Sequence, residues 1–140
     1  MTAKIPSELE FSTEIKRCFN NNDLSRAGDV ISHAIQCYTD NPYFRVSQAR
    51  LGTLLYKNSR DHVHLQTIEI AANHLITNHP KEFGLVGLSN LGHVYRERQK
   101  WNELEEVAGK ILKINPNDSF ALGFLCNVAI ARKDWKTLKI

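Results

Sequence analysis

The sequence contains six histidines, which are candidate residues for a metal site or a catalytic site. Two pairs are closely spaced, His62 with His64 and His74 with His79. Imidazole binds transition metals, but a zinc site needs three or four converging ligands. No Cys-x2-Cys or His-Glu-x2-His spacing accompanies these histidines. We therefore expect them to lie in solvated turns, and the sequence predicts neither a metal site nor a cofactor.

The acidic run Glu103, Glu105 and Glu106 is the next candidate for chemistry, as an acid/base pair. Its position just after a polar break fits better with the first turn of a helix, where the helix dipole favours negative charge. The sequence has no phosphate-cradling glycine loop and no nucleophile elbow. These observations predict that the protein is not an enzyme.

The three cysteines, Cys18, Cys37 and Cys126, are odd in number and far apart. A disulfide framework normally has an even number of cysteines. Cys18 and Cys126 fall at apolar helical positions, where a thiol behaves as a small hydrophobic group. We expect buried or inert thiols in a reducing compartment, which is typical of the cytoplasm.

The composition is ordinary for one water-exposed domain, with 42% hydrophobic and 24% charged residues in 140. No apolar run approaches the ~18 to 20 residues that span a bilayer, and the start MTAKIPSE lacks the apolar core of a signal peptide. A net charge of +3 does not by itself indicate nucleic acid. We expect a cytoplasmic protein with no membrane partner.

Residues 85–116 contain the clearest secondary-structure pattern of the sequence, and helices in this segment could hold the side chains of a site. Two groups of apolar residues at helical spacing flank the polar break 97–100, and a proline follows the second group. This pattern predicts a helical hairpin. The apolar positions are Leu88, Leu91, Gly92 and Tyr95, then Leu104, Val107, Ala108, Ile111 and Leu112.

The spacing Leu88-x2-Leu91-Gly92-x2-Tyr95 resembles the W-x2-LG-x2-Y signature of the tetratricopeptide repeat family. Trp101 and Trp135 lie 34 residues apart, the repeat length of that family. The resemblance implies an all-α, right-handed α-solenoid of about three and a half hairpins. It also implies that a glycine on the first helix of a hairpin lets the second helix approach closely.

The expected organisation is an N-terminal arm, 1–8, and a single domain, 9–140. Its repeat units cover 9–42, 43–82, 83–118 and the incomplete 119–140, which gives seven helices and a short C-terminal turn. Ser7 and Glu10 have the spacing of a capping box at the first helix. Pro42, Pro80 and Pro116 are predicted helix stops.

In tetratricopeptide arrays the first helix of each hairpin lines a concave groove, so the resemblance implies a groove that binds a peptide or helix of another protein. The groove positions by register are Ser12, Thr13, Lys16, Val46, Ala49, Arg50, Thr53, Lys57, Val86, Ser89, Asn90, His93, Arg96, Phe124 and Asn127. The best candidates for partner binding are Lys16, Arg50, Asn90, His93, Arg96 and Asn127. Arg50 and Arg96 would pair with carboxylates of the partner.

The predicted function is therefore a non-enzymatic scaffold or chaperone-like adaptor. The alternative is an RNA-binding helical-repeat protein, which needs a repeated base-reading position. The corresponding residues here, Thr13, Arg50, Asn90 and Phe124, follow no code, so nucleic acid is the weaker interpretation.

The segment 121–131, ALGFLCNVAIA, is apolar on nearly every side of a helix. Such a helix is normally covered all round. We expect the cover to come from a continuation of the array or from a second molecule, as in a homodimer. The interface residues would include Phe120, Phe124, Ile130, Trp135 and Leu138.

Overall fold

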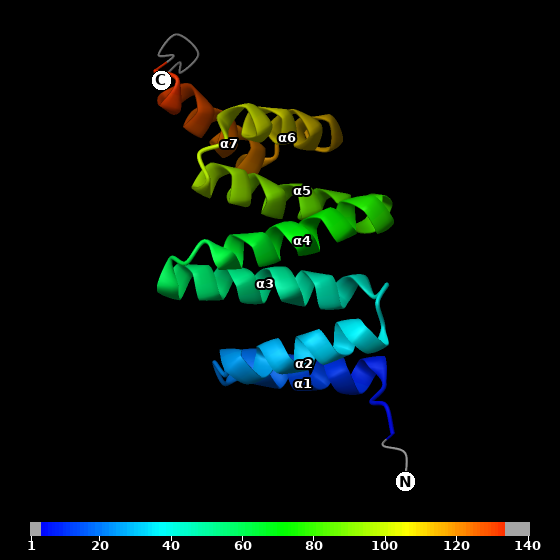
Figure 1. Cartoon of the computed structure of the whole chain (residues 1–140). Helices are drawn as coiled ribbons and strands as arrows, with labels where there is room; N and C mark the ends of the chain where they lie inside the picture. Colours follow the sequence, from blue (N-terminus) through cyan, green and yellow to red (C-terminus); the bar gives the residue numbers. More distant parts are fainter. Residues whose placement is uncertain (1–3, 134–140) are drawn as a thin grey trace. The chain divides into compact units, whose positions relative to one another are not determined.

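The computed structural model describes residues 4–133, and this part of the chain is helical without any strand. The all-α prediction is therefore confirmed (Figure 1). The helices are α1 (Glu8–Asn20), α2 (Leu24–Cys37), α3 (Pro42–Ser59), α4 (Val63–Asn78), α5 (Pro80–Glu97), α6 (Trp101–Ile114) and α7 (Ser119–Ala131).

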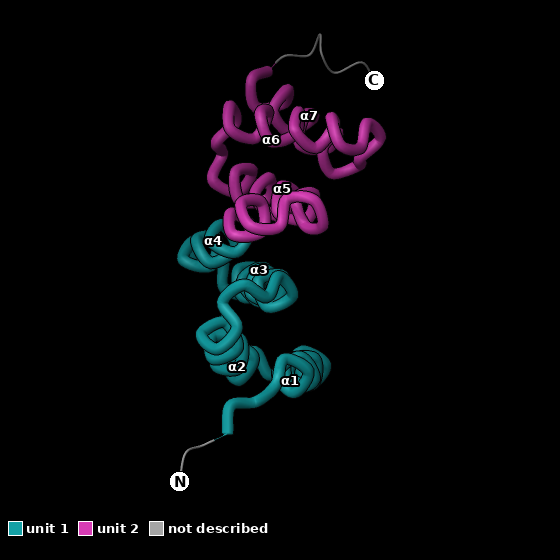
Figure 2. The backbone as a smooth tube through the Cα atoms, turned by 90° about the vertical axis from the view of Figure 1, so that its right-hand side faces the viewer, with its two compact units in different colours: residues 1–71 teal, residues 72–140 magenta. Residues whose placement is uncertain are grey.

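The chain forms two compact units, 1–71 and 72–140, with the boundary inside α4 (Figure 2). In the first unit α2 packs against both α1 and α3. In the second unit α6 packs against α5 and α7, and α7 also contacts α5. Helices that are neighbours in sequence are thus neighbours in space within each unit.

Polar side chains cap the starts of α1, α2, α3 and α7. The Ser7 backbone N–H donates to Oε1 of Glu10 at 3.1 Å, and the Glu10 backbone N–H donates to Oγ of Ser7 at 3.1 Å. This reciprocal pair is a capping box, as expected. Asp23, Asn41 and Asp118 accept backbone N–H groups at the starts of α2, α3 and α7.

Two of the predicted stop prolines are also starts. Pro42 and Pro80 are the first residues of α3 and α5, where proline's missing N–H costs no helical hydrogen bond. Pro116 lies in the connection between α6 and α7.

The turns inside the hairpins each have three residues, 21–23, 60–62 and 98–100. α3 continues to Ser59, so the turn before α4 is as short as the other two. Arg60 then takes the left-handed conformation, with φ of 59°, and closes the helix. The Arg60 N–H donates to the carbonyl of Tyr56 at 2.7 Å.

The first and third hairpin turns share one hydrogen-bond pattern. Asn22 and Gln99 have φ of 55° and 58°. The next N–H groups, of Asp23 and Lys100, donate five residues back, at 2.8 and 2.9 Å. Lys133, after α7, also has a positive φ of 53°. A bond across six residues closed by a left-handed residue is the Schellman motif, so α1–α2 and α5–α6 are joined in the same way.

Each unit has its own apolar core. In the first unit, the buried side chains of α1, α2 and α3 gather around Phe11, Ile31 and Phe44. In the second unit, those of α5, α6 and α7 gather around Leu104, Ile111 and Phe124. No polar or charged residue among those described is fully buried, so apolar contact dominates both cores.

Glycines allow close helix contacts, but not all in the expected direction. A Cβ on Gly52 would lie 2.8 Å from Cγ1 of Ile68 and 3.1 Å from the His64 carbonyl oxygen, so Gly52 admits α4 as expected. Gly92 differs, because a Cβ there would meet the ring of Phe124 on α7 and not α6. The alanines on the second helices of the hairpins are all fully buried: Ala27 and Ala34 on α2, Ala71 and Ala72 on α4, and Ala108 on α6.

Candidate functional site

A hollow between α1 and α3 is the strongest candidate site in the first unit. Its volume is about 250 Å³. We call it the α1–α3 hollow; its lining residues are Ser12, Ile15, Lys16, Phe19, Tyr43, Phe44, Val46, Ser47 and Arg50. Four of these, Ser12, Lys16, Val46 and Arg50, are predicted groove positions, and the structure brings them to one place.

Arg50 is held in this hollow by an aromatic ring. Its guanidinium carbon lies 4.3 Å from the ring centroid of Phe19. A guanidinium stacked on an aromatic face loses little of its hydrogen-bonding capacity, because its N–H groups lie in its own plane. The sequence analysis missed Phe19 as a site residue. The signal was available, since Phe19 follows Lys16 by three residues and so shares its helix face.

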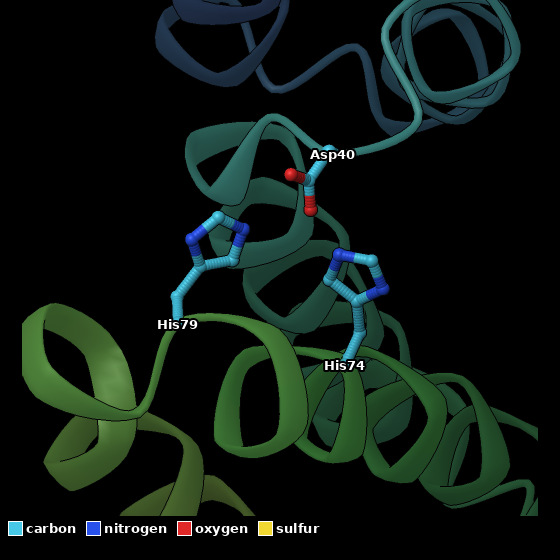
Figure 3. Close-up of side chains that lie close together, drawn as sticks. All are labelled: Asp40, His74 and His79. Atoms are coloured by element: carbon cyan, nitrogen blue, oxygen red, sulfur yellow. The ribbon is translucent and has the colours of Figure 1, made fainter.

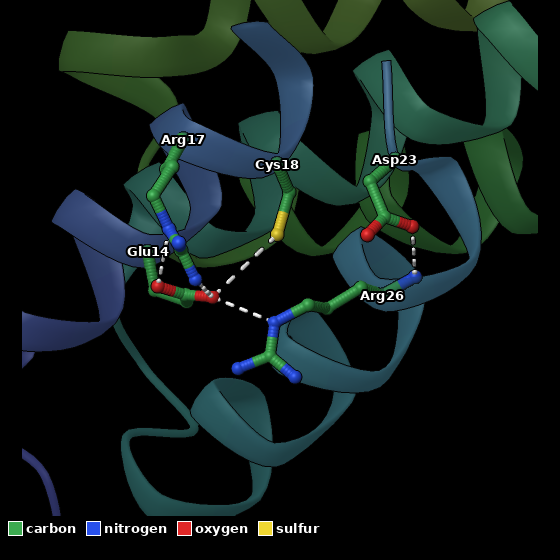
Figure 4. A network of polar contacts seen from close by, with 5 residues as sticks. All are labelled: Glu14, Arg17, Cys18, Asp23 and Arg26. Carbon is green, nitrogen blue, oxygen red and sulfur yellow. Dashed lines mark hydrogen bonds and ion pairs between the residues drawn. The ribbon is translucent and has the colours of Figure 1, made fainter. Parts of the chain in front are cut away.

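Lys16 and Arg50 have no carboxylate partner among the described residues, whereas other basic residues of the first unit do. Glu14 lies 2.7 Å from Nη2 of Arg17 and 2.7 Å from Nε of Arg26. Figure 4 shows this network on the surface of α1 and α2. The α1–α3 hollow is also lined by no carboxylate. Its two positive charges are therefore uncompensated.

The Glu14 network links α1 to α2 through the ion pair of Glu14 with Arg26. Hydrogen bonds from Arg17 and then Arg26 hold the pKa of Glu14 at about 2. Burial raises the pKa of the Cys18 thiol, whose Sγ lies 3.9 Å from the Glu14 carboxylate. A thiol with a raised pKa is a poor nucleophile at neutral pH. The burial that the sequence suggested for Cys18 is confirmed.

In the second unit, α5 and α7 bring together the other predicted site residues. The His93 ring meets Phe120 edge-on, with centroids 5.3 Å apart, and meets Phe124 at 5.1 Å. The Arg96 guanidinium carbon lies 5.9 Å from the Phe124 centroid, and its Nη2 lies 3.6 Å from Oε1 of Glu97. Burial, and then the charge of Arg96, lower the pKa of His93. Both effects favour the neutral form of the His93 ring.

Asn90 and Asn127 are half-buried on the same two helices. Asn90 donates from Nδ2 to the Val86 carbonyl at 3.0 Å, so part of its hydrogen-bonding capacity is used within α5. The structure thus divides the six predicted partner-binding residues between the units. Lys16 and Arg50 belong to the first unit, and the remaining four belong to the second.

Two predicted groove residues are not available to a partner. Ala49 and Phe124 are each 1% exposed. Phe124 was also a predicted interface residue, and that prediction is wrong because its ring packs against Gly92 in the core. Phe120 and Ile130 are exposed. A residue that contacts a partner must be exposed in the chain without that partner, so both meet this condition. The other two predicted interface residues, Trp135 and Leu138, lie outside the described residues.

The histidine pairs are less solvated than the sequence suggested. His64 and His74 are half-buried on α4, and His79 is half-buried directly after it. Figure 3 shows His74 on the helix and His79 beyond its end, with ring centroids 5.9 Å apart. The Asn78 side-chain amide lies 3.3 Å from Nδ1 of His74. His62 is exposed in a turn, as expected.

The acidic run of α6 has structural partners. Glu103 lies in the first turn of the helix. Glu105 pairs with Nη1 of Arg132 at 3.0 Å, and Glu106 pairs with Lys110 at 3.5 Å. The carboxylates at 105 and 106 therefore serve ion pairs, one of which ties α6 to the end of α7.

The remaining thiols differ in exposure. Cys37 is half-buried at the end of α2, whereas Cys126 is exposed on α7. Cys126 is therefore not one of the buried thiols that the sequence suggested, although it lies at an apolar helical position.

Comparison of the chain with protein-family models, curated proteins and solved structures finds no match. Within residues 4–133, no helix is both long enough and apolar enough to cross a bilayer.

Proposed function

We propose that this chain is a non-enzymatic protein-binding module, a scaffold or adaptor that holds a segment of a partner protein. The observation that carries the proposal is the α1–α3 hollow, in which two unpaired cations face a partly apolar lining. Binding surfaces of this kind combine an apolar contact area with a few polar groups that fix orientation.

The proposed architecture is a right-handed array of about three and a half hairpins of the tetratricopeptide type. Three observations support it. Successive helices pack as neighbours within each unit, the turns within hairpins have equal length, and two of these turns share one hydrogen-bond pattern. In repeat arrays of this kind each hairpin packs an apolar face against the next hairpin, and the stacked first helices expose a surface for ligands.

The partner segment should be acidic where it meets the first unit. Arg50 offers a planar fork of N–H donors that matches a carboxylate, and Lys16 adds a second positive charge at the same hollow. Phe19 limits the motion of Arg50 before binding, which reduces the entropy lost when the partner is held. In the second unit, Arg96 and the neutral His93 would contact the partner.

Selection from a displayed library of random peptides against the immobilised chain tests this function. We expect enrichment of sequences with Asp or Glu near aliphatic residues. The selected peptides should bind the variant Lys16→Ala, Arg50→Ala at least tenfold more weakly. Capture of natural partners should fall in the same way for the double variant Arg50→Ala, Arg96→Ala.

Arg60→Ala is the matched control for these variants. Arg60 is also an arginine beside an aromatic ring, with its guanidinium carbon 5.4 Å from the Tyr56 centroid, but it lies in a turn outside the hollow. If the Arg60 variant loses binding as strongly as the Arg50 variant, general surface charge explains the result and the proposed site is wrong.

A further inference from the structure

We infer that the α1–α3 hollow binds a phosphorylated side chain of the partner segment, an inference that rests on the proposed protein-binding function. The lining residues supply a charge and a set of donors that fit a phosphate monoester better than a single carboxylate. The size of the hollow fits one side chain.

The charge in the hollow is the first reason. Lys16 and Arg50 contribute two positive charges, and the lining contains no acid. A phosphate monoester carries about −1.5 to −2 at neutral pH, so it compensates both cations at once. A carboxylate carries one negative charge and would leave one cation without a partner.

The number of donors is the second reason. Arg50 can donate several N–H groups in one plane, and Lys16 can donate three from its ammonium. The half-buried Ser12 adds a hydroxyl whose hydrogen no described group accepts. The hydroxyl of Ser47 is already committed, since it donates to the Tyr43 carbonyl at 3.0 Å. Phosphate has three terminal oxygens for such donors, and three separate side chains are available to reach them.

The size and the rim of the hollow indicate a side chain of a peptide, not a free small molecule. Its volume of about 250 Å³ is below the ~300 to 1,000 Å³ typical of small-molecule sites. Tyr43, 65% exposed, and the half-buried Val46 form apolar parts of the lining. They offer contact to the residues that flank the phosphorylated one, as grooves for extended peptides do.

Arg50 is already placed for this role. The ring of Phe19 supports one face of its guanidinium at 4.3 Å, which leaves the N–H edge for oxygens. Unlike Arg17 and Arg26, it has no carboxylate competing for that edge among the described residues. Recognition of phosphorylated segments commonly uses such uncompensated arginines.

Titration of the isotope-labelled full chain with three small compounds tests the inference by nuclear magnetic resonance. The probes are N-acetyl-phosphoserine methylamide, N-acetyl-glutamate methylamide and inorganic phosphate. We expect the phosphoserine compound to shift the signals of Ser12, Lys16 and Arg50, and to bind at least tenfold more tightly than the glutamate compound. Inorganic phosphate should bind at the same residues but more weakly, because it lacks the contacts of the peptide backbone.

Single substitutions locate the effect. Arg50→Gln and Lys16→Gln should each weaken binding of the phosphoserine compound at least tenfold, whereas Arg60→Gln should leave it unchanged. Thermal unfolding of each variant checks that the helices are intact. Lys16 is exposed and has no described partner, so its variant stays informative if the Arg50 variant is destabilised.

The outcomes separate this inference from the proposed function. Equal binding of the phosphoserine and glutamate compounds would show a carboxylate site, which overturns the inference and leaves the protein-binding function standing. Equal binding of inorganic phosphate and the phosphoserine compound would overturn the assignment to a peptide side chain. A third outcome is that no probe shifts the signals of Ser12, Lys16 and Arg50, while binding of the selected acidic peptides still requires Arg50. This outcome would overturn the inference and leave the protein-binding function standing.

Discussion

The ring of Phe124 lies directly against the backbone of Gly92. A Cβ on residue 92 would sit 2.7 Å from Cζ and 2.9 Å from Cδ2 of that ring. Phe124 is 1% exposed, so it has no free space into which it could turn. This contact joins α5 to α7. The same ring meets His93 edge-on and lies below the Arg96 guanidinium, whose carbon is 5.9 Å from the ring centroid.

Gly92→Leu is therefore expected to be strongly destabilising. Overpacking a dense core costs ~1 to 3 kcal/mol or more, and here the obstacle is a buried aromatic ring. Chemical denaturation followed by circular dichroism measures the loss. His62→Ala is the silent comparison, because His62 is exposed and a surface change of this kind costs less than ~0.5 kcal/mol.

Gly109→Ala is a matched glycine control on α6. A Cβ there meets nothing within 4 Å, and alanine is favoured over glycine inside a helix by ~0.5 to 1 kcal/mol. This variant should be slightly more stable than the natural chain. A similar loss of stability for the variants at 92 and 109 would mean that the Phe124 contact is not what restricts residue 92.

Stability of the second unit should fall as the pH drops below about 6.5. The pKa of His93 is lowered in the folded protein from its ordinary value of 6.5. Between the folded and unfolded values the unfolded chain binds more protons, so protonation favours unfolding. Thermal melts from pH 7.5 to 5 should show a falling midpoint. His93→Gln should flatten this trend, whereas His62→Gln should preserve it.

A second loss of stability should appear at acid pH in the first unit. The pKa of Glu14 is about 2 in the folded protein, against 4.5 ordinarily, so its contribution is complete above pH 4.5 and disappears as the pH falls toward 2. In Glu14→Gln this part of the acid transition should be missing. At neutral pH the variant should be less stable by this same contribution, which solvent screening keeps small because the ion pairs are exposed. An unchanged acid transition would show that the Arg17 and Arg26 contacts do not persist in solution.

Self-association is expected through the exposed apolar face of α7. Leu122, Cys126 and Ile130 recur every four residues on this face, and all three are exposed. A strip of this kind is a common contact surface between helices. Sedimentation equilibrium should show a dimer. The double variant Leu122→Ser, Ile130→Ser should be a monomer, whereas the control Ile114→Ser, on α6, should remain a dimer. A clean monomer at high micromolar concentration, with no binding of a dye for apolar surface, would contradict this prediction.

The sequence by itself determined the helices and most of their ends, because these depend on local physics. The capping box at Ser7 and Glu10 formed as predicted, since a side chain there reaches backbone groups three residues away. Helical spacing of apolar residues also predicted the buried positions Leu104 and Ile111. The left-handed conformation of Arg60, which ends α3, has no signal in its residue type.

The tertiary structure alone decided which polar and aromatic residues meet. Register placed Lys16 and Arg50 on first helices, but only packing showed that they line one hollow and that Phe19 stacks on Arg50. Register also placed Phe124 in a groove, whereas packing buried it against Gly92. The physical reason is that helical spacing fixes which face a residue occupies. The neighbour that covers this face depends on contacts between residues far apart in the chain.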